Sequence, residues 1–514
     1  MKKNLLIDFP SLIFLGAITS LSLPPYNYLI INFLTFSLFF IFLIKRLDHY
    51  KNLKIFFLYG WFFGFGYFIT NLYWIPISLS FDQNFKFLIP LALFLIPAFL
   101  SIFYGLISFF FVILKPKSIV SSFFLFALMF GLLEFIRGSI LTGFPWNLIA
   151  YSFSNNLEIL SITSIIGTYG FNLVSITLFT SPAIFILRSS KYNIGFFIFF
   201  LVIFILFHSF GSIYKTNFNK EEESTYDYKV RVIGSNINMD RFYSNVDPAS
   251  IIQDLIKISN PNDNEKTIFV WPEGILAGIS QEKLIEFDWL FEKNFNDNHI
   301  LVIGINKQSI DNDHINYFNS FSVYNNKLNL ISSYDKINLV PFGEFLPFEN
   351  ILGNFGLSSI TNNYQSFSSG DKRDIIEIKK QNFTLKILPL ICYEIIYSGK
   401  IFSDTNFDLI INISEDGWFG RSIGPQQHFV HSIFRAIESG KYVLRSSNNG
   451  IAAIINPLGI VEKKVDFGQS GYVDLTTSRK IQPTVFSKYG NKIFGMLILL
   501  YIFLIFSFIK IRNE

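Results

Sequence analysis

The chain has 514 residues, of which 51% are hydrophobic and 16% charged, and Phe alone occurs 64 times. The formal net charge of +4 is too small to indicate a nucleic-acid partner, and a single cysteine excludes an intrachain disulfide. The length leaves room for more than one domain. The mean hydropathy of +0.40 is high for a soluble protein, so we expect part of the chain to lie in a lipid bilayer.

Apolar segments long enough to cross the bilayer's hydrocarbon core, about 30 Å thick, fill the first 214 residues. We predict seven spans here and an eighth at the end of the chain: Leu6–Leu23, Tyr28–Ile44, Ile55–Ile75, Phe87–Leu114, Ile119–Phe135, Ile159–Leu187, Ile194–Phe210 and Ile493–Ile511. Lys2 and Lys3 precede the first span, as in a signal peptide. No small-residue cleavage pattern follows and further spans come at once, so we predict a retained first span.

Basic residues gather in every second loop of this predicted bundle and at the two ends of the chain: Lys2, Lys3, Lys45, Arg46, Lys51, Lys54, Lys115, Lys117, Arg188, Lys191, Lys510 and Arg512. The intervening loops, such as Phe81–Lys86 and Gly138–Asn155, carry few charges. This is the positive-inside pattern. It predicts that both termini are cytoplasmic and that the long segment before the eighth span faces the other side of the membrane.

The composition changes to that of a soluble domain at residues 226–484. Short apolar runs recur between turn residues: Val230–Ile233, Thr267–Val270, Ile300–Ile305, Ser320–Tyr324, Leu385–Ile391, Leu409–Ile413, Val443–Arg445 and Ile451–Ile455. Helix-like segments lie between several of them: Asp247–Ile258, Gln281–Asn294 and Gly424–Gly440. This alternation predicts an α/β domain with buried strands. We therefore divide the chain into a seven-helix membrane region at 1–214, this domain at 226–484 and a C-terminal transmembrane helix at 491–511.

Three residues of this domain can carry chemistry: two follow apolar runs and the third lies in an otherwise apolar segment. Cys392 follows Ile387–Ile391, Glu273 lies in a Trp-Pro-Glu motif, and Lys336 begins a segment that ends in Pro-Phe-Gly-Glu. A thiol at a strand end can act as a nucleophile, a carboxylate there as a general base, and an ammonium can stabilise an oxyanion or a thiolate. Singly, each residue is better explained by structure, as a buried cysteine, a helix-capping carboxylate and a surface lysine.

Together these residues and their motifs resemble the nitrilase, or carbon-nitrogen hydrolase, superfamily. Its site has one Glu, one Lys and one Cys in that chain order, at the ends of different strands. The matching motifs here are Trp-Pro-Glu at 271–273, Lys with Pro-Phe-Gly-Glu at 336–344, and Ile-Cys-Tyr-Glu at 391–394. The resemblance implies a nitrilase-like αββα sandwich, preceded and followed by the predicted transmembrane helices.

Nearly the whole chain also resembles the apolipoprotein N-acyltransferase family within that superfamily. Further stretches carry this match: Gly143-Phe144-Pro145-Trp146, Asn412-Ile413-Ser414, Asp416-Gly417-Trp418-Phe419-Gly420, Ser422-Ile423-Gly424-Pro425, Gln427-His428, Arg435-Ala436 and Arg445-Ser446-Ser447-Asn448-Asn449-Gly450. The resemblance implies that Glu273 is the general base, Lys336 the oxyanion and thiolate stabiliser, and Cys392 the nucleophile. It implies supporting or substrate-placing roles for Glu344, Tyr393, Glu394, Asn319 and Trp418, although plain packing would equally explain Trp418.

The implied reaction moves an acyl chain from a phospholipid, through a Cys392 thioester, to the α-amine of the N-terminal diacylglyceryl-cysteine of an apolipoprotein. The resemblance also implies a monomeric enzyme of lipoprotein maturation in the bacterial inner membrane, with a periplasmic catalytic domain and no cofactor, metal or nucleic-acid partner. His428 and His431 are interpreted as structural, because no further ligand cluster accompanies them.

Two departures from the family motifs concern loop contacts and substrate preference. Glu415 stands where the family has Asn, and Gly234–Asn238 lacks the usual Gln-Gly. Tyr243 falls near the position of a functional aromatic residue, but its surroundings match poorly. Glu134 and Arg137, near the outer end of the fifth span, are interpreted either as an ion pair or as residues reaching the membrane interface.

Two other functions stay open from the residues alone. A membrane-tethered amidase or nitrilase would use the same three residues on a small soluble substrate and would release ammonia. A transporter or lipid-binding protein would carry an inactive outer domain. The intact Glu, Lys and Cys set and the few charged residues within the predicted spans argue against the second alternative.

Overall fold

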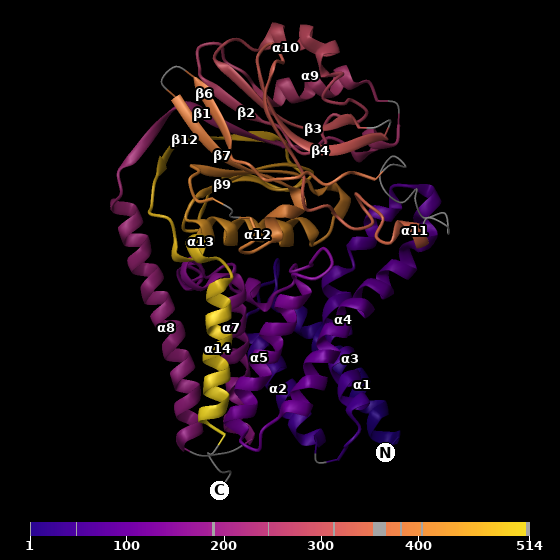
Figure 1. Cartoon of the computed structure of the whole chain (residues 1–514), viewed down its shortest axis with the longest axis vertical. Helices are drawn as coiled ribbons and strands as arrows, with labels where there is room; N and C mark the ends of the chain where they lie inside the picture. The colour runs from indigo at the N-terminus through magenta and orange to yellow at the C-terminus, as the bar shows by residue number, and fades with distance from the viewer. Residues whose placement is uncertain are drawn as a thin grey trace.

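The computed structural model describes residues 2–47, 49–187, 191–244, 246–311, 314–352, 366–380, 383–401 and 404–509. A bundle of long helices carries a sheet domain at one end (Figure 1). Helix α1 begins, and helix α14 ends, at the opposite end of the bundle (Figure 1). Of the basic residues used to predict the orientation, Arg188, Lys510 and Arg512 lie outside the described residues.

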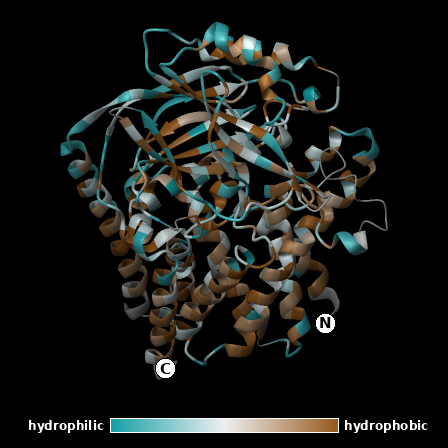
Figure 2. Ribbon diagram, turned by 45° about the horizontal axis from the view of Figure 1, so that its top comes forward, coloured by the Kyte–Doolittle hydropathy of each residue, from teal (hydrophilic) through white to brown (hydrophobic). Residues whose placement is uncertain are grey.

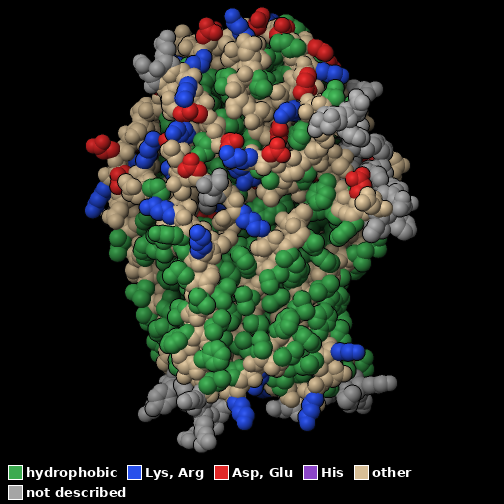
Figure 3. Space-filling view, in the orientation of Figure 1, with side chains coloured by type: hydrophobic (Ala, Val, Ile, Leu, Met, Phe, Trp, Pro, Cys, Tyr) green, Lys and Arg blue, Asp and Glu red, His purple; other side chains and the backbone are tan. Residues whose placement is uncertain are grey.

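The bundle contains seven helices, among the residues described, that are long and apolar enough to cross a membrane. They include α1 (Lys2–Thr19), α2 (Ile30–Leu47), α3 (Leu53–Leu72), α4 (Ile89–Leu114), α5 (Ile119–Arg137), α7 (Thr163–Leu187) and α8 (Lys191–Lys220), with a short α6 (Leu157–Leu160) before α7. Their ribbons are mostly hydrophobic (Figure 2). On the face of the bundle seen in Figure 3, apolar side chains form a broad band between the charged sheet domain and a few basic side chains at the opposite end. The seven predicted N-terminal spans are thus confirmed as long apolar helices.

The eighth predicted span is shorter than expected. Helix α14 covers Lys492–Ser507, which is 16 residues and roughly 24 Å at 1.5 Å per residue. It follows α13 (Val485–Tyr489) and packs within the bundle, where Tyr501 Oη lies 2.6 Å from Thr177 Oγ1 of α7. Ser121 Oγ of α5 donates to the Ile505 carbonyl at 2.9 Å. Helix α14 is therefore part of the bundle, although its length is below that of an ordinary span.

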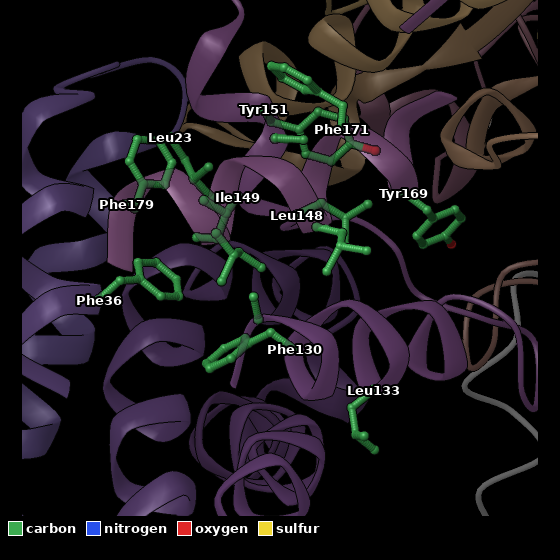
Figure 4. Close-up of a cluster of buried hydrophobic side chains, with 14 of the residues drawn as sticks. Leu23, Phe36, Phe130, Leu133, Leu148, Ile149, Tyr151, Tyr169, Phe171 and Phe179 are labelled. Carbon is green, nitrogen blue, oxygen red and sulfur yellow. The ribbon is translucent and has the colours of Figure 1, made fainter. Parts of the chain in front are cut away.

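Phenylalanine and glycine explain how the bundle packs. Buried aromatic rings fill its centre, and a close-up of this cluster labels Phe36, Phe130, Phe171 and Phe179 (Figure 4). Gly16 lets α1 approach α3 closely, because a Cβ at this position would lie 1.9 Å from the Phe63 carbonyl oxygen. Such contacts suit a membrane, where helices associate through close packing rather than through the exclusion of water.

In the described part of the sheet domain there are twelve strands: β1 (Glu223–Ser235), β2 (Thr267–Val270), β3 (His299–Asp311), β4 (His314–Asn325), β5 (Leu330–Asp335), β6 (Ile376–Lys380), β7 (Phe383–Ile391), β8 (Leu409–Glu415), β9 (Tyr442–Asn448), β10 (Ala452–Ile455), β11 (Val461–Val465) and β12 (Gly471–Arg479). The main strand order is β5-β4-β3-β2-β1-β9-β8-β7-β6. Strands β1 and β9 share only two residue pairs, and each pairs further with another neighbour, β12 or β10. Because β1 and β9 pair over so short a length, the sheet separates between these two strands into two halves.

The two halves form the inner layers of an αββα sandwich. Alternate residues of each half, such as Val230, Val270, Ile387 and Ile411, form one buried core between the halves. The opposite face of the first half packs against α9 (Pro248–Ser259) and α10 (Asp288–Asn294). The opposite face of the second half packs against α12 (Gly424–Ser439), which lies between the sheet and the bundle (Figure 1). The predicted fold class is confirmed.

All eight predicted apolar runs lie in strands, but the sequence analysis did not identify β5, β6, β11 and β12. These four strands alternate buried and exposed residues or are largely exposed, as in Ile376–Lys380, so they contain no continuous apolar run. Of the predicted helices, Asp247–Ile258 corresponds to α9 and Gly424–Gly440 to α12. Only the last part of Gln281–Asn294 is α-helical, because a 3₁₀ helix at Leu284–Phe287 precedes α10.

Buried polar side chains join α12 to the bundle. Gln427 Oε1 accepts hydrogen bonds from the indole N–H groups of Trp146 at 2.9 Å and Trp74 at 3.2 Å. Glu438 Oε1 accepts from the Thr168 backbone N–H at 2.7 Å, next to the kink of α7 at Gly167. Arg435 Nη2 donates to Thr168 Oγ1 at 2.7 Å. These directional contacts fix the layer beneath the sheet on the ends of the helices.

Candidate active site

Cys392, Glu273 and Lys336 come together at one edge of the folded sheet. Strands β2, β5 and β7 run in the same direction, so their carboxyl ends meet there. Glu273 follows β2, Lys336 follows β5 directly, and Cys392 follows β7 as the first residue of a 3₁₀ helix, Cys392–Ile396. The three residues are at most 8% exposed.

Lys336 lies between two carboxylates. Its Nζ is 3.1 Å from Glu273 Oε1 and 3.0 Å from Glu344 Oε1. Asn319 Nδ2 donates to the same two oxygens at 2.7 and 2.8 Å. Burial by itself lowers the pKa of Lys336, but the negative charges of Glu273 and Glu344 outweigh it and hold the pKa well above its usual value. The ammonium therefore stays charged and balances the buried carboxylates.

Cys392 occupies a strained backbone position. Its φ of 48° lies in the left-handed region, which non-glycine residues rarely adopt. The Cys392 carbonyl accepts hydrogen bonds from His428 Nε2 at 3.3 Å and from Asn412 Nδ2 at 3.5 Å. These two bonds stabilise the turn between β7 and the 3₁₀ helix. Burial and the charge of Glu273 raise the pKa of the Cys392 thiol well above its usual value, while Lys336 opposes the shift. The resting thiol is therefore protonated and needs a base to react.

Alkylation of the thiol tests this protonation state. We expect iodoacetamide to react slowly with folded Cys392 near pH 7, and the rate to keep rising above about pH 8.5, where an ordinary thiol is half ionised. The denatured chain is the control, and its alkylation rate should level off just above the pKa of an ordinary thiol. The unfolded chain loses this proton first, so this thiol's contribution to stability should fall as the pH rises through that range. A plateau at or below pH 7 in the folded protein would contradict the interpretation.

The comparisons with known proteins agree on one family. A family model described as "Apolipoprotein N-acyltransferase N-terminal domain" matches residues 15–180, and one described as "Carbon-nitrogen hydrolase" matches 246–483. An apolipoprotein N-acyltransferase of Rhizobium leguminosarum bv. trifolii (strain WSM2304) is 32% identical over 481 residues, which cover 90% of this chain and 89% of the relative. The chain belongs to the apolipoprotein N-acyltransferase family.

A second relative, the apolipoprotein N-acyltransferase of Rickettsia prowazekii (strain Madrid E), is 32% identical over 457 residues, 86% of each chain. Among solved structures, Saccharomyces cerevisiae Nit3, a member of the nitrilase superfamily, covers 48% of this chain and 90% of its own at 18% identity and a TM-score of 0.34. Family membership confirms the prediction that this chain is an acyltransferase with a carbon-nitrogen hydrolase domain.

In this family member, Glu394 organises the site without approaching the Lys336 ammonium. Its Oε1 accepts from Tyr334 Oη at 2.6 Å and from the Ile337 N–H at 3.1 Å, and it pairs with Arg373. Its Oε2 accepts from the Ile391 N–H at 2.9 Å. Glu394 thus links the segment after Lys336 to the turn that carries Cys392. This geometry indicates a positioning residue.

Tyr393 connects the site to the membrane part. Its hydroxyl donates to the Gly143 carbonyl at 2.8 Å, and its ring lies beside Phe144. The same loop, 138–147, is held by Arg137, which donates to the Phe144 carbonyl and forms an ion pair with Glu134. The ion-pair interpretation of Glu134 and Arg137 is therefore correct. Both side chains are buried inside the protein rather than exposed on the surface of the bundle.

The other predicted residues lie around the site in different roles. Trp418 is partly buried, with its ring centre 5.1 Å from that of Phe242 and 5.9 Å from that of Phe81 in the membrane part. Tyr243 is 46% exposed. His428 Nδ1 lies 2.8 Å from Asp416 Oδ1, which agrees with a structural role for His428. Within the described part of the chain, no group of His, Cys, Asp and Glu residues could hold a metal ion.

Sequence reasoning missed two features of this site. Asp416, His428 and Arg445 form a buried network behind Cys392, with Arg445 Nη2 2.8 Å from Asp416 Oδ2. The sequence contains the motif around Asp416 but does not predict that His428 connects this network to the Cys392 carbonyl. Glu415 donates its backbone N–H to Glu273 Oε2 at 2.9 Å. Only its departure from the family motif marked this residue in the sequence.

Proposed function

We propose that this chain transfers an acyl group from a phospholipid, through a thioester on Cys392, to the α-amine of the diacylglyceryl-cysteine that begins an apolipoprotein. One observation carries the proposal: the strained Cys392 lies beside the buried Glu273–Lys336–Glu344 cluster, in a domain fixed onto membrane helices. The names of the relatives support the acceptor. The two lipid substrates explain why the site is built on the bundle.

In the first half-reaction, Glu273 accepts the thiol proton of Cys392 and the thiolate attacks an ester carbonyl of the phospholipid. The Lys336 ammonium and the Tyr393 backbone N–H stabilise the tetrahedral oxyanion. The ester C–O bond then breaks, and Glu273 returns the proton to the leaving oxygen as the lysophospholipid departs. The acyl group remains on sulfur as a thioester, which reacts readily with amines.

In the second half-reaction, the neutral α-amine of the acceptor attacks the thioester carbonyl. Glu273 takes a proton from the attacking nitrogen, and the C–S bond breaks as the amide forms. The proton then passes to the Cys392 sulfur, which restores the resting thiol. Because the donor product leaves before the acceptor reacts, ping-pong kinetics should follow.

The same proposal assigns the orientation and the parts of the chain. Because of the basic loops, we propose that both termini are cytoplasmic and that the catalytic domain, residues 226–484, lies in the periplasm beside a bacterial inner membrane. We propose 1–214 as the membrane part and 491–511 as the C-terminal transmembrane segment, of which α14 covers Lys492–Ser507. The bundle gives way to the catalytic domain between the end of α8 at Lys220 and the start of β1 at Glu223. We propose that the enzyme acts as a monomer.

Mass spectrometry of the purified protein tests the proposed reaction. Incubation with phospholipid should add the mass of one acyl chain to the peptide that contains Cys392, and a diacylated lipopeptide should remove it and gain the same mass. Small amides, as matched alternatives, should release no ammonia above the background. Ammonia release without acylation would favour the amidase alternative, and transport activity that persists in a Cys392→Ala variant would favour the transporter.

A further inference from the structure

Glu415 is the last residue of β8, and it contacts the proposed general base through its backbone. Its N–H donates to Glu273 Oε2 at 2.9 Å, whereas Lys336 and Asn319 occupy Oε1. The orientation of the Glu273 carboxylate therefore depends on where the backbone of Glu415 lies. Hydrogen bonds to both oxygens leave this carboxylate little freedom to rotate.

The side chain of Glu415 is fixed by three further partners. Its Oε1 accepts from the Gly417 N–H at 2.8 Å, and its Oε2 accepts from Asn448 Nδ2 at 2.7 Å. The same Oε2 forms an ion pair with Arg241. Both charged side chains are at most 2% exposed. A buried pair of this kind loses most of its solvation, so each charge depends on the other for compensation.

Arg241 joins this pair to the aromatic residues at the rim. It lies in the segment after β1, where its Nη1 donates to the Asn238 carbonyl at 3.0 Å. Its guanidinium carbon lies 4.3 Å from the centre of the Phe242 ring, and that ring packs against Trp418. The pair bridges the segments after β1 and β8 beside the short pairing of β1 with β9, where the sheet opens into its two halves.

We propose that Glu415 and Arg241 form a positioning pair that holds Glu273 in place and keeps the local charge balanced around it. The inference rests on the proposed role of Glu273. Neither residue is assigned a role by the three-residue chemistry. If one charge of the pair is removed, the other charge remains buried without its partner, at a residue whose backbone holds Glu273. This charge should change how readily Cys392 loses its proton.

The sign of that change differs between the two partners. Without the Glu415 charge, the uncompensated Arg241 should favour the ionised form of Cys392. Without the Arg241 charge, the buried Glu415 should disfavour that form or take up a proton itself. The other charged or titratable groups around this region stay in place in both variants: Lys336, Glu344, Asp416, His428 and Arg445. A purely structural role would shift both profiles in one direction or in neither.

The test compares Glu415→Gln, Arg241→Gln and the double variant. We expect each single change to slow Cys392 acylation by phospholipid about tenfold or more, through kcat rather than KM, because Glu273 loses its orientation. The acid limb of the pH profile should move to lower pH in Glu415→Gln and to higher pH in Arg241→Gln, each by about half a pH unit or more. The double variant should return the limb to the wild-type position.

Iodoacetamide alkylation of Cys392 gives a second readout that needs no lipid, with shifts of the same sign. The alkylation assay tests the Glu415–Arg241 pair separately from the proposed acyl transfer from phospholipid. Even if the wild-type protein formed no acyl-enzyme, its alkylation profile could still be measured. Asp474→Asn is the matched control, since it removes the partner of buried Arg231 on β1, 2.7 Å away, and should leave both profiles unchanged. If a Gln variant does not fold, Arg241→Lys replaces it in the test. This variant keeps the positive charge and should therefore keep the wild-type profile. Equal shifts in both single variants, no shift, or a shift in Arg241→Lys would overturn the proposal.

Discussion

Replacing Cys392 with alanine is expected to abolish acyl transfer, by at least about four orders of magnitude in kcat, while the protein remains folded. Cys392 is the only cysteine in the chain, so no second thiol can accept the acyl group. The rest of the site does not depend on the sulfur atom: Lys336 keeps its contacts with Glu273 and Glu344, and Glu394 keeps the turn in place. The assay is acyl transfer from phospholipid to a diacylated lipopeptide in detergent.

The thermal unfolding curve is the necessary companion measurement. Removal of one buried sulfur atom should cost about 1 kcal/mol or less of the free energy of unfolding, because the left-handed backbone is equally strained for alanine. Cys392→Ser is the closer control for geometry, and it too should form no thioester. Activity within tenfold of the wild type in Cys392→Ala would show that the acyl group is carried elsewhere or passes directly between the two lipids.

Replacing Lys336 with methionine should have the second largest effect, on both stability and activity. Glu273 and Glu344 would then face the same Asn319 amide without a cation between them. Removing one partner of a buried pair costs about 3–5 kcal/mol, and removing an oxyanion donor costs about 10²- to 10³-fold in kcat. We expect the variant to unfold at a lower temperature and to form almost no acyl-enzyme.

The pH dependence of this loss has a definite sign. Two adjacent buried carboxylates cannot both remain ionised at low cost, so the folded variant should take up a proton that the unfolded chain does not hold. The destabilisation should therefore be smaller at pH 5 than at pH 8. The double variant Lys336→Met with Glu344→Gln should recover stability but not acylation. Wild-type stability of the single variant at pH 8 would mean that the ammonium does not compensate these carboxylates.

The hydrophobic pattern of the sequence and the order of its motifs were enough to predict the membrane spans, most of the strands and the superfamily. Long apolar runs give the seven spans, because a helix in lipid must satisfy its own backbone and present apolar side chains. Continuous apolar runs also gave the eight strands that lie deepest in the sheet. The chain order of Glu273, Lys336 and Cys392, together with the short motifs around them, was enough to indicate the superfamily. These properties are local, and neighbouring residues decide them.

Only the tertiary structure decided how those residues meet. Glu273 and Lys336 are 63 positions apart, and Glu273 and Glu415 are 142 apart, yet each pair is in contact. The four missed strands are half-exposed, so their place depends on the strand beside them rather than on their own composition. The ion pair of Glu415 with Arg241 likewise has no local signal. Burial gives such contacts their strength, and burial exists only once the two halves of the sheet have closed on each other and on the membrane helices.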